Sequence, residues 1–102
     1  MEITYETLDN KVIVKASGEL NILNAGELEQ TSLYAIKHNS FPLVMDFTSL
    51  SYISSSGLSA IIHISKEIRD MKRKMSITMQ NGAVCEVFKK TGLFSIFDIR
   101  II

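Results

Sequence analysis

The alternation of hydrophobic and polar residues predicts an antiparallel hairpin at the start of the chain. Apolar and polar side chains alternate over residues 3–7 and again over Lys11–Ser17, a pattern typical of strands with one buried face. Asp9 and Asn10, between these segments, are residues that favour tight turns. We therefore expect the two strands to pair, with residues 18–21 closing the second strand.

A helical pattern follows from about Ala25 to His38. Asn24 stands three residues before Glu27, close to the spacing of a capping box. Lys37 and His38 fall in the last turn, where positive charge interacts favourably with the helix dipole. The residues expected to face the core are Ala25, Leu28, Ser32, Ala35 and Ile36.

The segment Leu43–Phe47, which follows the only proline, predicts a central strand. Nearly all of its residues are apolar, so both faces of this strand are expected to be covered. After residues 48–52 and a run of serines, a second helix is expected from about Ser56 to Lys72. Its core-facing positions are Leu58, Ile61, Ile64, Ile68 and Met71.

The remaining third of the chain predicts a strand, a helix and a last strand. The strands are expected at Met75–Gln80 and at residues 97–102, and the helix at Gly82–Thr91, capped by Asn81. Gly92 is suited to the left-handed position after a helix. The order ββαβαβαβ predicts an α/β fold with right-handed crossovers. We expect one domain over residues 1–102, with a mostly parallel sheet of about five strands, a hairpin edge, and three to four helices.

Composition narrows the classes of function. Eleven basic residues balance eleven acidic ones, so no general attraction to nucleic acid or anionic membranes is expected. The single cysteine, Cys85, lies among apolar neighbours and is interpreted as a small residue of the core or its boundary, in a reducing compartment. No apolar run approaches the ~20 residues that span a bilayer, and the first residues do not resemble a signal peptide. A soluble, cytoplasmic monomer is expected.

The candidate chemistry lies at the start of the second helix, where Ser54, Ser55 and Ser56 precede Gly57. A helix start has unpaired backbone N–H groups and the positive end of the helix dipole, which favour a negative group such as a phosphate on serine. The simpler interpretation is that these serines cap the helix and fill a turn. Gly57 has a structural interpretation as well, because a residue without a side chain allows the turn to approach the sheet.

Enzymatic alternatives have weaker support. A serine hydrolase needs a base within hydrogen-bond reach of its nucleophile, but His63 lies two turns along the helix from Ser55, and His38 ends another helix. The glycine-rich loops that hold nucleotide phosphates are missing from the sequence, as is the spacing of metal ligands. We therefore expect neither an enzyme, nor a metal site, nor a cofactor.

The run DFTSLSYISSSGL over residues 46–58 and the element order resemble the STAS domain, and most closely the single-domain anti-sigma factor antagonists of bacteria. Residues 18–21 resemble the turn that follows the second strand in that family. Asp46 matches a polar position near the end of the central strand, and residues 91–94 resemble the turn after the third helix. The likeness covers essentially the whole chain.

The resemblance implies a function controlled by phosphorylation. In the family, a partner that is both an anti-sigma factor and a serine kinase phosphorylates the first signature serine, which corresponds to Ser55, with Ser54 and Ser56 as alternative acceptors here. The free antagonist binds the kinase, phosphorylation releases it, and a phosphatase restores binding; ATP and magnesium belong to the kinase. This chain departs from the family pattern at Ser54, which replaces an aspartate, at Asn21, which replaces an aspartate, and at Ser59, which replaces a glycine.

The predicted partner surface is the serine turn, the exposed start of its helix and nearby loops. Its residues are Asn21, Asp46, Ser54, Ser55, Ser56, Gly57, Ser59 and His63. Asp46 is expected near the same end of the sheet, where it would strengthen the negative field. Ile22 and Leu23 either add apolar contact surface or pack against the helix that follows. The alternative function is a STAS interaction module that is never phosphorylated, acting as a signalling scaffold or a transporter-associated subunit.

Overall fold

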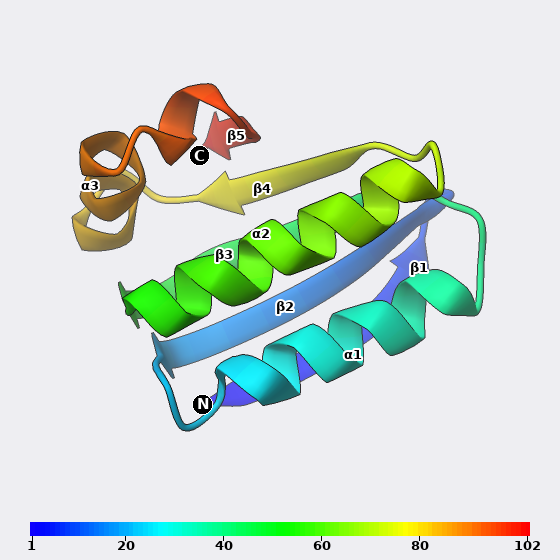
Figure 1. Cartoon of the computed structure of the whole chain (residues 1–102), viewed down its shortest axis with the longest axis horizontal. Helices are drawn as coiled ribbons and strands as arrows, with labels where there is room; N and C mark the ends of the chain where they lie inside the picture. Colours follow the sequence, from blue (N-terminus) through cyan, green and yellow to red (C-terminus); the bar gives the residue numbers. More distant parts are fainter.

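A five-stranded sheet with helices packed on one side forms the core of the molecule (Figure 1). The computed structural model describes residues 1–102. The elements are β1 (Glu2–Leu8), β2 (Lys11–Leu20), α1 (Ala25–Lys37), β3 (Leu43–Ile53), α2 (Ser55–Asp70), β4 (Met75–Met79), α3 (Ala83–Lys90), the 3-10 helix η1 (Leu93–Ser95) and β5 (Asp98–Ile101). The predicted α/β class and element order are confirmed.

The strands lie in the order in which they occur along the chain, from β1 at one edge to β5 at the other. β1 and β2 are antiparallel, and every other neighbouring pair is parallel. This confirms the mostly parallel sheet with a hairpin at its edge. The carboxyl ends of β2, β3 and β4 therefore lie at the same edge of the sheet, from which the candidate serines follow.

The hairpin turn explains why Asp9 and Asn10 lie between the first two strands. Both residues have positive φ, 52° and 60°, the backbone shape that joins twisted strands through a two-residue turn. The second strand does not end at Ser17, however. It continues to Leu20 with two irregularities in its pairing to β3, so the prediction of a turn at residues 18–21 is wrong. Gly18, with a φ of 91°, lies at one of these irregularities.

The central strand β3 is also longer than predicted, since it continues through residues 48–52 to Ile53. Leu50 and Ile53 are buried in this extension, and their side chains join the core. The strand remains paired with β2 to its end, where Ile53 lies opposite Leu20. The serine turn therefore starts at the end of a long strand, far from Phe47.

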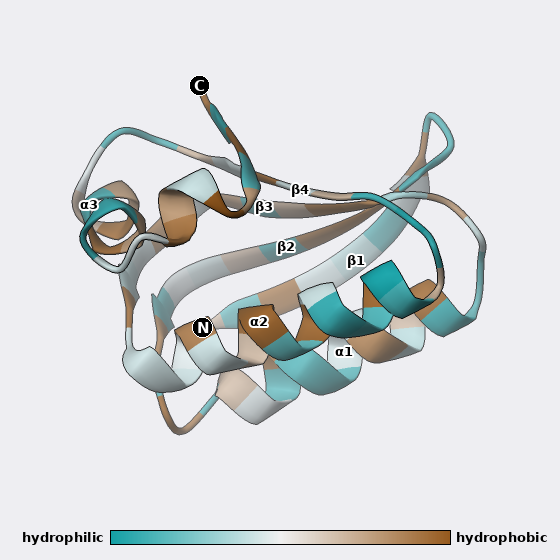
Figure 2. Cartoon of the chain, turned by 45° about the horizontal axis from the view of Figure 1, so that its top comes forward, coloured by the Kyte–Doolittle hydropathy of each residue, from teal (hydrophilic) through white to brown (hydrophobic).

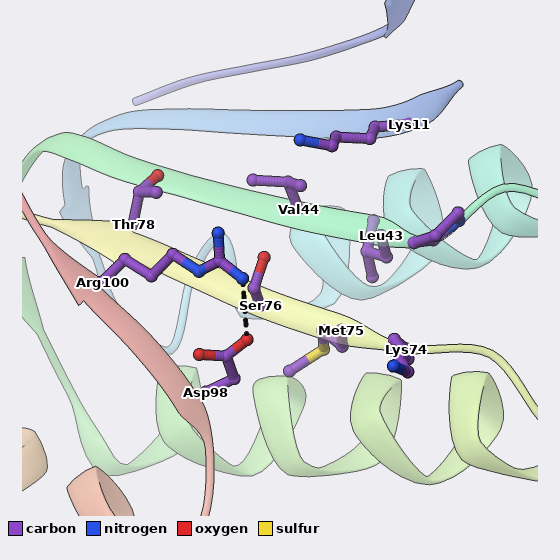
Figure 3. A pocket seen from close by; sticks show the side chains of 10 residues that line it. Lys11, Leu43, Val44, Lys74, Met75, Ser76, Thr78, Asp98 and Arg100 are labelled. Atoms are coloured by element: carbon purple, nitrogen blue, oxygen red, sulfur yellow. Dashed lines mark hydrogen bonds and ion pairs between the residues drawn. The ribbon is translucent and has the colours of Figure 1, made fainter. Parts of the chain in front are cut away.

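Only one face of the sheet is covered by helices. Leu43 and Met45 are fully buried under α1 and α2, whereas Val44 and Asp46 alternate with them and are only half-buried. Figure 3 shows the uncovered face, where Val44, Ser76, Thr78 and Arg100 stand over the strands and Asp98 pairs with Arg100. The prediction that both faces of the central strand are covered is wrong, because the neighbouring strands present polar residues on this face.

The helices bury the faces that the sequence predicts. In α1 the five expected positions are all buried, and in α2 the residues Leu58, Ile61, Ile64 and Ile68 are buried against the sheet. The fifth position predicted for the second helix, Met71, lies just after the end of α2 and is only half-buried. Figure 2 shows the alternation of hydrophobic and hydrophilic residues along both helices. Cys85 is fully buried in α3, as expected, and Gly92 takes the predicted left-handed conformation with a φ of 80°.

Two predicted helix caps are not made. The Asn24 side chain accepts a hydrogen bond from the backbone N–H of Asn21 and donates to the carbonyl of Glu19, so it makes no cap hydrogen bond to α1. The third helix starts after Gly82, and the Asn81 side chain does not cap it. No helix of the structure is both long enough and apolar enough to cross a membrane.

Candidate functional site

The start of α2 is fixed by Ser54, the N-cap residue of the helix. Its Oγ accepts a hydrogen bond from the backbone N–H of Gly57 at 3.2 Å, and its carbonyl accepts from the N–H of Leu58 at 3.0 Å. Its own N–H donates to the carbonyl of Leu20 at 2.9 Å. Ser54 therefore links the end of β2 to the first turn of the helix, and its hydroxyl is occupied by capping.

Ser55, the first residue of α2, is the serine of this run whose side chain is exposed. Ser54 and Ser56, on either side of it, are half-buried. At this position the Ser55 hydroxyl lies in the first helical turn, beside N–H groups that no helical carbonyl can satisfy. A phosphate placed there would meet these donors and the positive end of the dipole.

Gly57 allows this turn to lie directly against the sheet. A Cβ atom on Gly57 would come within 2.8 Å of Leu20 Cγ, a distance that real Cβ atoms essentially never show, and 3.0 Å from Ile53 Cγ1, which is also a tight contact. The structural interpretation of Gly57 is therefore confirmed: the missing side chain makes room for two core residues. The contact holds the first turn of α2, and with it Ser55, at the carboxyl edge of the sheet.

The loop between β2 and α1 borders the serine turn, and Asn21 organises it. The Asn21 side-chain oxygen accepts from the N–H of Leu23 at 2.9 Å, and its backbone carbonyl accepts from the N–H of Ala25, also at 2.9 Å. Ile22 and Leu23 are 76% and 91% exposed. They do not pack against α1, so of the two interpretations left open by the sequence, the structure supports exposed apolar surface.

Tyr52 is a surface residue of this edge that the sequence pattern does not predict. It lies opposite Glu19 near the ends of β3 and β2, two residues before Ser54, and half of its surface is exposed. The signal was an aromatic residue among hydroxyl residues at a strand end. Because residues 48–52 do not follow the regular alternation of a strand, the sequence pattern does not indicate that Tyr52 lies at this edge.

Ser59 and His63 lie farther along α2, on the side that faces α1. Both line a shallow groove between the two helices, together with Ser56 and Glu29. His63 Nδ1 lies 3.0 Å from the Glu29 carboxylate oxygen, so the imidazole is paired with α1. The structure thus brings Ser56, Ser59 and His63 together.

Asp46 lies elsewhere, and its expected position near the serine turn is wrong. It is in the middle of β3, opposite Lys15 and Thr78 of the neighbouring strands, on the face of the sheet that no helix covers. Its carboxylate accepts hydrogen bonds from the backbone N–H and the hydroxyl of Thr48, at 3.0 and 2.7 Å. The carboxylate therefore has a local structural role.

The arrangement around Ser55 suits the acceptance of a negative group at a protein surface. The structure contains no group of three or more His, Cys, Asp or Glu side chains that could hold a metal ion. Titratable side chains of the predicted site are Asp46 and His63, which bind Thr48 and Glu29 respectively. The features that remain at the turn are a capped helix start, an exposed hydroxyl and an apolar loop.

The chain is similar in sequence to known proteins along nearly its whole length. Residues 2–101 match the sequence profile of the STAS domain. BtrV of Bordetella bronchiseptica, a protein named as an anti-sigma factor antagonist, is 29% identical over 99 residues, covering 97% of this chain and 85% of BtrV.

Solved structures share the fold. An anti-sigma factor antagonist of Thermotoga maritima superposes with a TM-score of 0.85 at 24% identity, covering 95% of this chain and 84% of that protein. SpoIIAA, an anti-sigma factor antagonist in its unphosphorylated form, gives a TM-score of 0.83 at 18% identity, covering 99% and 88%. The phosphorylated form of SpoIIAA from Bacillus gives 0.73 at 18% identity, covering 99% and 91%.

Proposed function

This chain belongs to the STAS domain family, and from that membership we propose that it is an anti-sigma factor antagonist controlled at Ser55. In its free form it binds a partner that is both an anti-sigma factor and a serine kinase. Phosphorylation of Ser55 by that partner ends the binding, and a serine phosphatase restores it. The similarity to BtrV and to the antagonists of known structure supports the class of protein.

The single observation that carries the proposal is the exposure of Ser55 in the first turn of α2. A kinase can reach this hydroxyl without unfolding any element, whereas the neighbouring Ser54 hydroxyl is occupied by the Gly57 N–H. The free N–H groups and the dipole of the helix stabilise the phosphate once it is attached. The fold is therefore expected to be the same in both forms.

The switch operates at the contact rather than in the fold. A phosphoserine carries about −1.5 to −2 charges at neutral pH. If a partner docks against the neutral Ser55 hydroxyl, the added charge would be buried without a matching cation, which costs several kcal/mol. A loss of that size lowers affinity by orders of magnitude.

The exposed apolar loop supplies the contact area that such docking needs. Ile22 and Leu23 follow the end of β2, and Tyr52 lies near the end of β3, so all three are exposed at the carboxyl edge from which α2 begins. Interfaces commonly combine a few apolar and aromatic anchors with a polar rim, which Asn21 and Ser59 would provide here. In this proposal the partner covers the loop and the serine turn together, so the charge on Ser55 falls within the contact.

Ser54 replaces the aspartate of the family pattern without loss of the local geometry. Serine and aspartate are both preferred N-cap residues, because each offers a side-chain oxygen to a free backbone N–H. The hydrogen bond from Gly57 to Ser54 Oγ is this cap. The substitution is therefore compatible with presentation of Ser55 to a kinase.

The proposed role is regulatory and not enzymatic. ATP and magnesium would be bound by the kinase. We propose that the complex forms in the cytoplasm. His63, the histidine of α2, is paired with Glu29 of α1. This pairing fits a surface residue that joins the two helices better than a catalytic base for Ser55.

Phosphate mapping tests the proposal. The protein is incubated with its cognate kinase and ATP, and the modified residue is identified by mass spectrometry. We expect one phosphate on Ser55 and none on the Ser55→Ala variant. The matched control is Ser40→Ala, an exposed serine outside the helices and strands, which should be modified like the parent protein.

The alternative function gives a different result. An interaction module that is never phosphorylated would bind its partner but acquire no phosphate on residues 54–56. That outcome would overturn the switch.

A further inference from the structure

A second surface of the molecule, separate from the serine turn, has the properties of a helix-binding groove. It lies between the outer side of α2 and the segment formed by η1 and the start of β5, and has a volume of about 360 Å³. Its apolar lining comes from Ile62, Ile68, Met75, Leu93, Ile96 and Phe97. We propose that this groove binds an amphipathic helix with acidic flanks, contributed by a partner protein.

The arrangement of the helices over the sheet supports a helical occupant. α2 packs against α1 on one side only, and in Figure 1 no helix lies over β4 on the other side. Helices that pack side by side lie about 8–10 Å apart, so the next place in the layer is beside α2, over β4. The groove occupies this place, and a helix bound there would extend the layer made by α1 and α2.

Two exposed isoleucines flank the groove. Ile62 lies on the outward side of α2, and Ile96, which is 70% exposed, follows η1 on the opposite side. Between them, Ile68 is almost fully buried and forms part of the floor. Contiguous apolar surface of this kind on a small protein commonly marks a binding surface.

The charges around the groove select an acidic occupant. Lys66 and Arg69 are exposed, follow Ile62 at helical spacing, and make no ion pair with any acidic residue of the chain. The only acidic residue at the groove, Asp98, is already paired with Arg100 at 3.3 Å. Unpaired cations beside an apolar strip favour an amphipathic helix with glutamates or aspartates next to its apolar face.

The length of the groove sets the length of the occupant. Residues 62 to 69 of α2 span about two helical turns, or about 10 Å. A partner helix therefore needs apolar residues at about three positions on one side, spaced three or four residues apart. Burial of these residues would provide most of the affinity, and the contacts of Lys66 and Arg69 with acidic side chains would fix the orientation of the bound helix.

The test uses a synthetic peptide of about 15 residues with leucines at this spacing and glutamates at the other positions. Titration into the isotope-labelled full chain is followed by NMR. We expect the shifted resonances to map to residues of the groove, and the affinity to fall as ionic strength rises. A peptide with lysine in place of every glutamate should bind at least about tenfold more weakly.

Variants of the protein locate the binding site. Ile96→Glu and the double variant Lys66→Glu, Arg69→Glu should each weaken peptide binding by about tenfold or more. Both changes are at exposed positions, so the variants are expected to fold. Leu8→Glu, an exposed apolar position on β1, is the matched control and should bind like the parent.

Three results would overturn the proposal: peptide binding that is unchanged in both groove variants, binding of the lysine peptide with equal affinity, or no binding at all. Self-association of the protein that Ile96→Glu abolishes would instead identify a second copy of this chain as the occupant. The proposed switch is tested separately, because Ser55→Asp should leave peptide affinity unchanged even if the kinase no longer binds.

Discussion

Gly57 and Leu20 are in such close contact that a single methyl group on Gly57 would come within 2.8 Å of the leucine side chain. Alanine usually stabilises a helix relative to glycine by about 1 kcal/mol. At this position we expect the opposite, because the added methyl group must displace Leu20 or Ile53 from the core. Gly57→Ala should lower the free energy of unfolding by about 1–3 kcal/mol, measured by urea denaturation.

The control for this prediction is Gly26→Ala in α1. A Cβ on Gly26 would have nothing within 4 Å, so this variant should be as stable as the parent or more stable. Equal gains in stability from the two substitutions would show that Gly57 is not in close contact with the sheet.

The N-cap at Ser54 gives a second prediction. Ser54→Ala removes the acceptor for the Gly57 N–H and should cost about 1 kcal/mol of stability. Ser54→Asp keeps a cap and places negative charge at the positive end of the helix, so it should be as stable as the parent or more stable. Thermal unfolding of the two variants and of the parent protein checks this order. A Ser54→Asp variant that is less stable than the parent would contradict the capping role of Ser54.

Ser32 is a buried polar residue with no hydrogen-bond partner for its hydroxyl. It lies within α1 on the face that packs against the core. Ser32→Ala should increase the free energy of unfolding by about 1 kcal/mol, because it removes an unpaired polar group and introduces a better helix former. Chemical denaturation measures the change, and a loss of stability would mean that the hydroxyl has a partner in solution.

Arg73 holds the connection between α1 and β3 in place. Its guanidinium donates to the carbonyls of Ile36 and Phe41 and to the side-chain oxygen of Asn39. Burial lowers the pKa of Arg73 below its usual value, but a guanidinium stays charged at neutral pH. Arg73→Ala should cost about 2–4 kcal/mol of stability, since it leaves several acceptors unsatisfied.

Arg73→Lys should recover only part of this loss, because one ammonium group cannot reproduce the planar fork of donors. The exposed neighbour Arg69 is the control, and Arg69→Ala should change stability by no more than about 0.5 kcal/mol. Similar effects at the two positions would contradict the bridging role of Arg73.

The order of elements and the core faces could be predicted from the sequence because periodic apolar positions decide them. The stripe from Ala25 to Ile36 and the alternation of Met75, Ile77 and Met79 correspond to the observed packing. The lengths of β2 and β3 could not be predicted in this way. Their last residues, which include three serines and a glycine and do not alternate regularly between apolar and polar, form strand because the two strands pair with each other there.

The position of Asp46 was predicted wrongly for the same reason. With β3 expected to end at Phe47, Asp46 was expected beside the serine turn, but the strand continues to Ile53 and carries the turn away from it. The Asn24 cap was wrong because its side chain instead joins the end of β2 to the loop, through Glu19 and Asn21. Such competition between partners is decided by tertiary contacts.

The exposure of Ser55 was predicted correctly, because the helix start could be located from the serine run and the apolar stripe that follows it. The surface around it was only partly predicted. From the sequence, Ile22 and Leu23 could equally be exposed contact surface or pack against α1. Only the tertiary structure shows that both side chains are exposed.

We expect a negative charge on Ser55 to end binding of the kinase without disturbing the fold. The most direct measurement is the affinity of the cognate kinase for Ser55→Asp and Ser55→Ala, determined side by side by calorimetry, with Ser40→Asp as a control for added charge elsewhere. We predict binding at least about a hundredfold weaker for Ser55→Asp than for Ser55→Ala or Ser40→Asp, with Ser55→Asp at least as stable to heat as Ser55→Ala. Equal affinities of Ser55→Asp and Ser55→Ala would show that charge at Ser55 does not control the binding.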